Sequence, residues 1–231
     1  MTVNKKLNVS KKFIKDTRAM AHQLYTTGEF TINEQKSTLE QLEGRFSFIN
    51  QLDKYNNKID TVNKHNMFYL NSREQEYKKF LFFKYFFANE KPLIITEGKT
   101  DIRYIKAALK KEYASYPDLI EKKEDGSFVF KISFFKRTKR WKYFFNMSTD
   151  GADAMKTLYK CLTETNNKFN YITYFEKITK KHPQKPIIFI FDNETITNRP
   201  LKNFLSVAKI TSINKDLLQK KCTYIYIRIF S

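Results

Sequence analysis

Two short apolar runs constrain the fold of this chain more than any other feature. Residues 92–96 and 186–191 each begin with proline, consist largely of β-branched and aromatic residues, and are followed by polar residues. Runs of this kind are typical of strands that are buried on both faces in a parallel sheet. The chain is therefore expected to contain an α/β domain built on a mainly parallel sheet.

Strand patterns alternate with helix patterns from residue 92 onward. Strands are expected at 92–96, 128–135, 186–191 and 223–230, and helices at 100–114, 148–163 and 200–208. Such alternation indicates βαβ units. We therefore assign residues 92–231 to one α/β domain.

The first sixty residues have helical patterns instead. Apolar residues recur at helical spacing through residues 10–25 and again through 39–52. Residues 31–34 have the Thr-x-x-Glu pattern of a capping box, which predicts that a helix begins there. Residues 1–60 are expected to form a helical module, and residues 61–91 a linker followed by a buried aromatic helix.

The charge of the chain indicates a polyanionic partner. It has 43 Lys and Arg residues against 24 Asp and Glu residues, for a formal net charge of +19. This charge favours association with nucleic acid, whether DNA, RNA or an RNA–DNA hybrid. No apolar stretch approaches the roughly 20 residues that span a bilayer, so no membrane partner is expected. The chain has no visible secretory signal and its two cysteines lack metal or redox spacing, which predicts a cytoplasmic location.

Acidic residues follow both apolar runs. Glu97 and Asp101 come after the first run, and Asp192 and Glu194 come after the second. Ligands gather at the carboxyl ends of the strands in open α/β sheets, and carboxylates are the hard oxygen donors that Mg²⁺ prefers. The four acids are therefore candidate ligands for Mg²⁺, with Mn²⁺ as the other candidate ion. The structural alternative is that Glu97 and Asp101 favour a helix N-terminus and that Asp192 turns the chain.

The order and spacing of these motifs resemble the Toprim domain of topoisomerases, bacterial primases and a group of nucleases. Glu97 and the glycine after it are similar to the first motif of that family, and Asp192-x-Glu194 is similar to its Asp-x-Asp motif. The resemblance covers residues 92–230 and implies a Rossmann-like Toprim fold. It also implies that Glu97 is catalytic, as general acid/base or bridging ligand, while Asp192 and Glu194 hold the metal with support from Asp101.

A second resemblance lies upstream of the apolar runs. Residues 3–20 and 42–46 are similar to the stretch that leads into the thumb of bacterial retron reverse transcriptases. One retron type carries a Toprim domain after its reverse transcriptase, so the resemblance implies a thumb that grips nucleic acid, joined to an antiphage effector. The chain contains no Tyr-x-Asp-Asp motif, so no polymerase activity is expected from it alone. A reverse transcriptase palm acting in trans is a candidate partner.

A basic cluster provides candidate nucleic-acid contacts. Its members are Lys136, Arg137, Lys139, Arg140, Trp141 and Lys142. Cations neutralise phosphates, and aromatic faces stack on unpaired bases. The alternative is a solvated basic loop with Trp141 in the core. Lys99 is a further candidate phosphate contact, because it lies at an expected helix N-terminus.

Together these patterns predict a Mg²⁺-dependent Toprim nuclease that cleaves DNA or RNA and carries a thumb that grips nucleic acid. The alternative is a noncatalytic remnant of a truncated retron reverse transcriptase, whose thumb binds RNA or an RNA–DNA hybrid. The acids after both strands favour the enzyme, whereas the missing palm favours the remnant. The choice between DNA and RNA as substrate stays open at this point.

Overall fold

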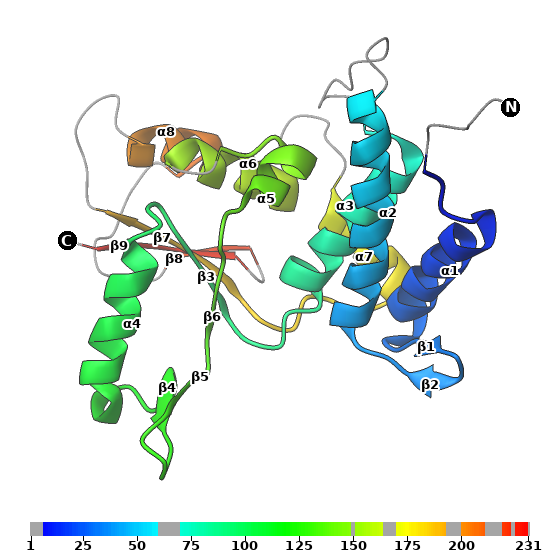
Figure 1. Ribbon diagram of the computed structural model, residues 1–231. Helices are drawn as coiled ribbons and strands as arrows, with labels where there is room; N and C mark the ends of the chain where they lie inside the picture. Colours follow the sequence, from blue (N-terminus) through cyan, green and yellow to red (C-terminus); the bar gives the residue numbers. More distant parts are fainter. Residues whose placement is uncertain are drawn as a thin grey trace, which may run out of the picture. The chain divides into compact units, whose positions relative to one another are not determined.

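The chain divides into two compact units (Figure 1). The computed structural model describes residues 7–59, 70–148, 151–163, 170–192, 200–210, 219–222 and 225–230. A helical unit comprises Met1–Phe87 and Tyr171–His182, and a sheet unit comprises Ala88–Asn170 and Pro183–Ser231. The segment Tyr171–His182 thus belongs to the helical unit, although the sequence analysis places it within the α/β domain of residues 92–231.

The sheet unit is built on a five-stranded sheet with the strand order β6-β3-β7-β9-β8. Its strands are β3 (Leu93–Thr96), β6 (Ser133–Phe134), β7 (Ile187–Asp192), β8 (Gln219–Cys222) and β9 (Ile225–Phe230). The strands β6, β3, β7 and β9 run parallel to their neighbours, whereas β8 pairs antiparallel with β9. The expected α/β class with a mainly parallel sheet is therefore confirmed.

Helices cover both faces of this sheet. Their bounds are α4 (Asp101–Lys111), α5 (Lys139–Phe145), α6 (Ala152–Thr163) and α8 (Pro200–Ala208). In Figure 1, α5, α6 and α8 lie on one side of the sheet and α4 lies on the other. Phe191 of β7 packs on Phe204 of α8 with 4.5 Å between ring centroids, and Ile94 of β3 packs with Leu109 of α4. Covering both faces explains why the strand sequences are apolar almost throughout.

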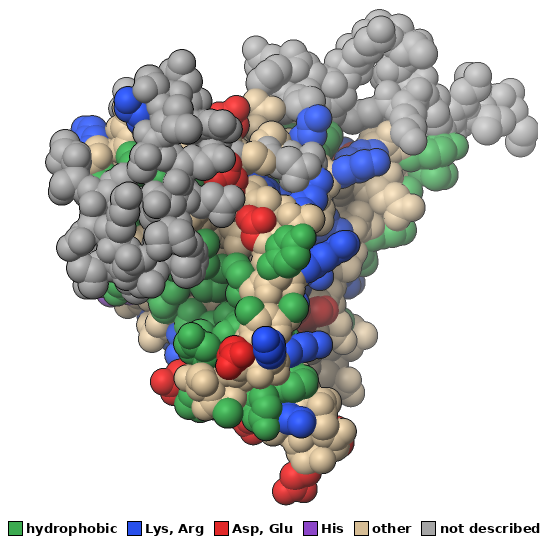
Figure 2. Space-filling model, turned by 90° about the vertical axis from the view of Figure 1, so that its left-hand side faces the viewer, with side chains coloured by type: hydrophobic (Ala, Val, Ile, Leu, Met, Phe, Trp, Pro, Cys, Tyr) green, Lys and Arg blue, Asp and Glu red, His purple; other side chains and the backbone are tan. Residues whose placement is uncertain are grey.

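The expected strand at residues 128–135 is two short strands in the structure. β5 (Phe128–Phe130) pairs antiparallel with β4 (Ile120–Lys122), whereas β6 joins the main sheet beside β3. A short 3₁₀ helix, Tyr113–Ser115, connects α4 to this hairpin. Figure 2 looks onto the side of the structure that carries α4 in Figure 1, where Lys and Arg side chains lie among hydrophobic ones.

The helical unit contains four α-helices among its described residues. They are α1 (Lys11–Thr27), α2 (Leu39–Ile59), α3 (Ser72–Phe82), which continues as a π-helix over Phe83–Phe87, and α7 (Tyr171–Thr179). The Ser10 hydroxyl accepts a hydrogen bond from the Phe13 N–H at 3.1 Å and so caps α1, which ends at Gly28 with a φ of 87°. No helix in the described part of the chain is long and apolar enough to cross a membrane.

Residues 31–34 do not begin a helix, so the expectation of a capping box there was wrong. They lie in a small hairpin of β1 (Thr31–Ile32) and β2 (Gln35–Lys36), whose turn has positive φ angles at Asn33 and Glu34. The capping box lies seven residues later: the Thr38 hydroxyl accepts from the Gln41 N–H at 3.3 Å, and the Gln41 side chain accepts from the Thr38 N–H at 2.8 Å. The same four-residue pattern therefore occurs in a turn and in a cap.

Aromatic packing explains why α7 belongs to the helical unit. The ring of Phe175 is fully buried and lies 5.0 Å from the rings of both Tyr25 and Phe83, and 5.5 Å from that of Phe87. Tyr171, one turn earlier, stacks on Phe82 at 4.7 Å. Aromatic side chains bury large apolar areas, so this cluster holds α7 against α1, α3 and the π-helix, which lie far earlier in the sequence.

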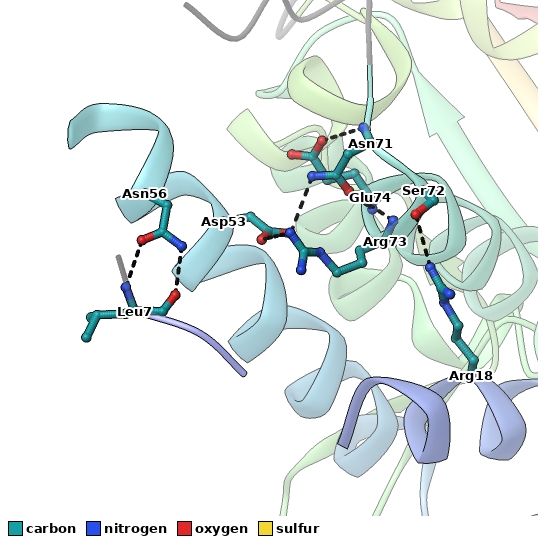
Figure 3. Close-up of polar contacts among 8 residues, drawn as sticks. All are labelled: Leu7, Arg18, Asp53, Asn56, Asn71, Ser72, Arg73 and Glu74. Carbon is teal, nitrogen blue, oxygen red and sulfur yellow. Dashed lines mark hydrogen bonds and ion pairs between the residues drawn. The ribbon is translucent and has the colours of Figure 1, made fainter. Parts of the chain in front are cut away.

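A buried polar network joins α2 to the start of α3 (Figure 3). Arg73 forms an ion pair with Asp53 at 2.6 Å, and the Asn71 side chain donates to Asp53 at 3.5 Å. Asn71 also caps α3 in a reciprocal capping box with Glu74. Asp53 is 6% exposed, and this burial raises the pKa of its carboxyl more than the nearby Arg73 and the Asn71 hydrogen bond lower it.

Candidate active site

The two acidic motifs lie at the same edge of the sheet. β3 and β7 are parallel neighbours, and Thr96 pairs with Ile190 in their register. Glu97 is one residue beyond this pair and Asp192 is two residues beyond it. The backbones of Glu97 and Asp192 therefore lie at the same edge of the sheet, although the two apolar runs are far apart in sequence. Open α/β sheets bind ligands at this edge.

A tight turn connects the end of β3 to α4. The Asp101 carboxylate accepts a hydrogen bond from the Gly98 N–H at 2.7 Å, and the Thr96 hydroxyl donates to the Gly98 carbonyl at 2.8 Å. A Cβ atom on Gly98 would lie 2.7 Å from Asp101 Oδ1, closer than real Cβ contacts. A side chain at this position would therefore displace the carboxylate from its hydrogen bond with the Gly98 N–H. Asp101 is also the first residue of α4, where a carboxylate favours the helix N-terminus, as the helix-terminus alternative predicts.

The side chain of Arg137 donates hydrogen bonds to the backbone of this turn. Its Nη2 donates to the carbonyls of Thr96, at 3.1 Å, and Glu97, and its Nη1 donates to the carbonyl of Gly151 at 3.1 Å. The guanidinium thus ties the end of β3 to the start of α6. Arg137 is among the phosphate contacts expected from the sequence, but its positioning role could not be predicted, because backbone carbonyls leave no pattern in a sequence.

The described residues supply part of the expected metal site. Glu97 and Asp101 are both half-buried at the end of β3, whereas Glu194 lies outside the described residues and only the backbone of Asp192 is described. Among the side chains that the structure describes, no three His, Cys, Asp or Glu residues converge as a metal site would require. The described carboxylates offer hard oxygen donors, the kind that Mg²⁺ and Mn²⁺ prefer.

The basic cluster divides between surface and core. Lys136, Lys139 and Lys142 are exposed, and Arg140 is half-buried. Trp141 is only 3% exposed, and its ring packs 4.9 Å from those of Phe135 and Phe145. The core alternative for Trp141 is therefore the correct one, because a buried ring offers no open face to a nucleobase.

Two further exposed residues lie near the start of the helix that follows the motif. Lys99 precedes α4 and is exposed, as a phosphate contact requires. Tyr104 is 73% exposed in the first turn of α4 and was not among the candidates expected from the sequence. Its exposure could be found from the pattern, because Ile102, Ile105 and Leu109 define the apolar face of this helix and Tyr104 lies off that face.

Comparisons with known proteins add no family assignment. No protein-family model matches the chain, and no solved structure matches it.

Proposed function

We propose that the sheet unit is a Mg²⁺-dependent nuclease of the Toprim kind that cleaves DNA or RNA phosphodiester bonds. The observation that supports this most strongly is the parallel pairing of β3 with β7, which places Glu97 and Asp192 at one edge of the sheet. A favourable position in the first turn of α4 explains Asp101 alone. It does not explain why a second acidic motif follows the neighbouring strand.

In this proposal the four acids have different roles. Asp192 and Glu194 hold the ion, Asp101 supports it, and Glu97 is the general acid/base or a bridging ligand. One oxygen of Asp101 accepts from Gly98, and a carboxylate has a second oxygen that can meet a cation. Bound Mg²⁺ or Mn²⁺ would neutralise charge on the phosphoryl group and activate water.

The helical unit is proposed to grip the nucleic acid as a thumb does. The support is the resemblance of residues 3–20 and 42–46 to retron reverse transcriptases, together with the net charge of +19. Lys136, Lys139 and Lys142 add exposed cations in the sheet unit. By the same resemblance, the protein would serve as an antiphage effector, with a reverse transcriptase palm supplied in trans.

A second candidate function is noncatalytic binding of RNA or an RNA–DNA hybrid. It is favoured by the hydrogen bond between Asp101 and Gly98, which a purely structural helix start also explains. Both candidates predict binding of nucleic acid that weakens with salt. Only the nuclease predicts cleavage that depends on a divalent ion.

The test is a cleavage assay with the purified full chain. Labelled single- and double-stranded DNA, RNA, tRNA and an RNA–DNA hybrid are incubated with Mg²⁺, with Mn²⁺ and with EDTA. The nuclease predicts cleavage of at least one substrate with a divalent ion and none in EDTA. Binding of the same substrates without cleavage under any of these conditions would favour the noncatalytic candidate.

A further inference from the structure

Tyr104 is the most exposed large hydrophobic side chain among the described residues. It is 73% exposed, whereas Tyr116, another exposed tyrosine of the sheet unit, is 49% exposed. Its backbone N–H donates to the Thr100 carbonyl at 3.2 Å, which places it in the first turn of α4. The ring thus lies within one helical turn of Asp101, where the acidic motif ends.

The helix directs this ring toward the motif. In an α-helix the Cα–Cβ bond tilts toward the N-terminus, so the side chain of Tyr104 lies over the turn that contains Thr100 and Asp101. From the next turn, the neighbours on the same face are Ala107 and Ala108, both exposed and small. The side chains of α4 therefore leave room beside the ring for another flat group.

Exposed cations lie near Tyr104 along the chain. Lys99 and Arg103 are close to the motif in sequence, and Lys111 lies two helical turns beyond Tyr104 on the same side of α4. An aromatic platform with cations near it is the arrangement by which proteins bind single-stranded nucleic acid: bases stack on the ring while the cations follow the backbone. In a duplex, by contrast, the bases are already stacked on one another.

We infer that Tyr104 stacks on an unpaired nucleobase and holds a single strand of DNA or RNA at the Glu97–Asp101 motif. This inference rests on the proposed nuclease function and narrows its substrate to single strands. Tyr104 has the role of a substrate-binding residue that sets which nucleotide lies beside the acids. Because every base has a flat face, the contact selects single strands and not a particular sequence.

The test measures binding in EDTA, so that it does not depend on cleavage. Fluorescence anisotropy gives the Kd for labelled oligo(dT), oligo(rU) and a duplex with wild type, Tyr104→Ala, Tyr104→Phe and the control Tyr116→Ala. Tyr104→Ala should weaken binding to a single strand by about 5- to 100-fold, the usual range for loss of one stacking contact, and leave duplex binding unchanged. Tyr104→Phe and Tyr116→Ala should bind as wild type, because the first keeps the ring and the second removes a ring beyond the far end of α4.

Photo-crosslinking identifies the contact directly. An oligonucleotide that carries 5-iodouracil should crosslink to Tyr104, as located by mass spectrometry of the digested protein.

Wild-type affinity in Tyr104→Ala, or an equal loss of affinity in Tyr116→Ala, would overturn the inference. If single strands bind through Tyr104 but Mg²⁺ produces no cleavage, the proposed nuclease function fails and the stacking contact survives as a binding site. If cleavage occurs and Tyr104→Ala binds normally, only the stacking inference fails.

Discussion

The Asp101 carboxylate accepts a hydrogen bond from the Gly98 backbone at 2.7 Å, and it occupies the space that a side chain on Gly98 would need. This hydrogen bond helps to fix the turn between β3 and α4, together with the contacts of Thr96 and Arg137. It also orients one of the two described acids of the candidate metal site. The absence of a side chain at position 98 is therefore linked to the orientation of a proposed functional group.

Substitution of Gly98 tests this relationship. In Gly98→Ala the new Cβ would lie 2.7 Å from Asp101 Oδ1, so the carboxylate must move and lose its hydrogen bond. We expect the free energy of unfolding to fall by about 1 kcal/mol, the usual net contribution of one hydrogen bond. The control is Gly44→Ala in α2, where the new Cβ meets no atom within 4 Å and alanine favours the helix. Urea denaturation that finds both variants equally stable would contradict the prediction.

Replacement of Arg137 by lysine should loosen the same turn. Lysine keeps the charge, but it cannot reproduce the planar group that donates to the carbonyls of Thr96, Glu97 and Gly151. We expect a loss of about 1–3 kcal/mol in unfolding free energy and faster hydrogen exchange at the Gly98 amide. Lys136→Gln, a change at the neighbouring exposed cation, should have little effect on either measurement. The positioning role is refuted if exchange at Gly98 is the same in both variants.

The exposed lysines of the basic cluster should contribute to the salt dependence of nucleic-acid binding. Replacing Lys136, Lys139 and Lys142 by glutamine should reduce the slope of log K against log salt by about 2–3, if each lysine neutralises one phosphate. The control variant replaces three exposed lysines of the hairpin region, Lys122, Lys123 and Lys131. Anisotropy titrations over a range of salt concentrations give the slopes. An equal change in the control would mean that net charge, and not the cluster, determines the slope.

Asp53 should make the stability of the helical unit depend on pH. Because burial raises the pKa of its carboxyl, the folded state binds a proton more readily than the unfolded state does. The contribution of this group is therefore favourable below the ordinary aspartate pKa and decreases as the pH rises from that value through the raised one. In Asp53→Asn the free energy of unfolding should fall less steeply with pH across this range than in wild type. If the free energy of unfolding depends on pH in the same way in wild type and in Asp53→Asn, the raised pKa of Asp53 is contradicted.

The parts of the fold that could be predicted are those with local causes. The runs at 92–96 and 186–191 were recognisable as strands because burial on both faces leaves almost no polar residue. The hairpin at 31–34 was not, because Thr31-x-x-Glu34 in a turn and Thr38-x-x-Gln41 at a helix start both fit the capping-box pattern. The place of α7 depends on the packing of Phe175 against helices far away in sequence, and no local pattern encodes it.

Some residues of the candidate site could also be predicted from the sequence, and others could not. The acids were recognisable because they follow the strands directly. The burial of Trp141 and the carbonyl contacts of Arg137 depend on neighbours that only the folded chain brings together. An exposed aromatic such as Tyr104 could be found from helical spacing, once the apolar face of α4 was known.

The central claim is that the acids at the ends of β3 and β7 perform metal-dependent cleavage. Its most direct test is the rate of cleavage in Mg²⁺ by wild type, Glu97→Gln and Asp192→Asn, with Glu112→Gln as the matched control. Glu112 is an exposed acid just beyond the opposite end of α4. Nucleic-acid affinity is measured for each variant in EDTA, so that lost binding is not mistaken for lost chemistry.

We predict that Glu97→Gln and Asp192→Asn each lower the cleavage rate by about 100-fold or more, as removal of a catalytic acid/base or a metal ligand does, while affinity stays near that of wild type. Glu112→Gln should cleave as wild type. Wild-type cleavage that persists in EDTA, or full activity in Asp192→Asn, would contradict the account.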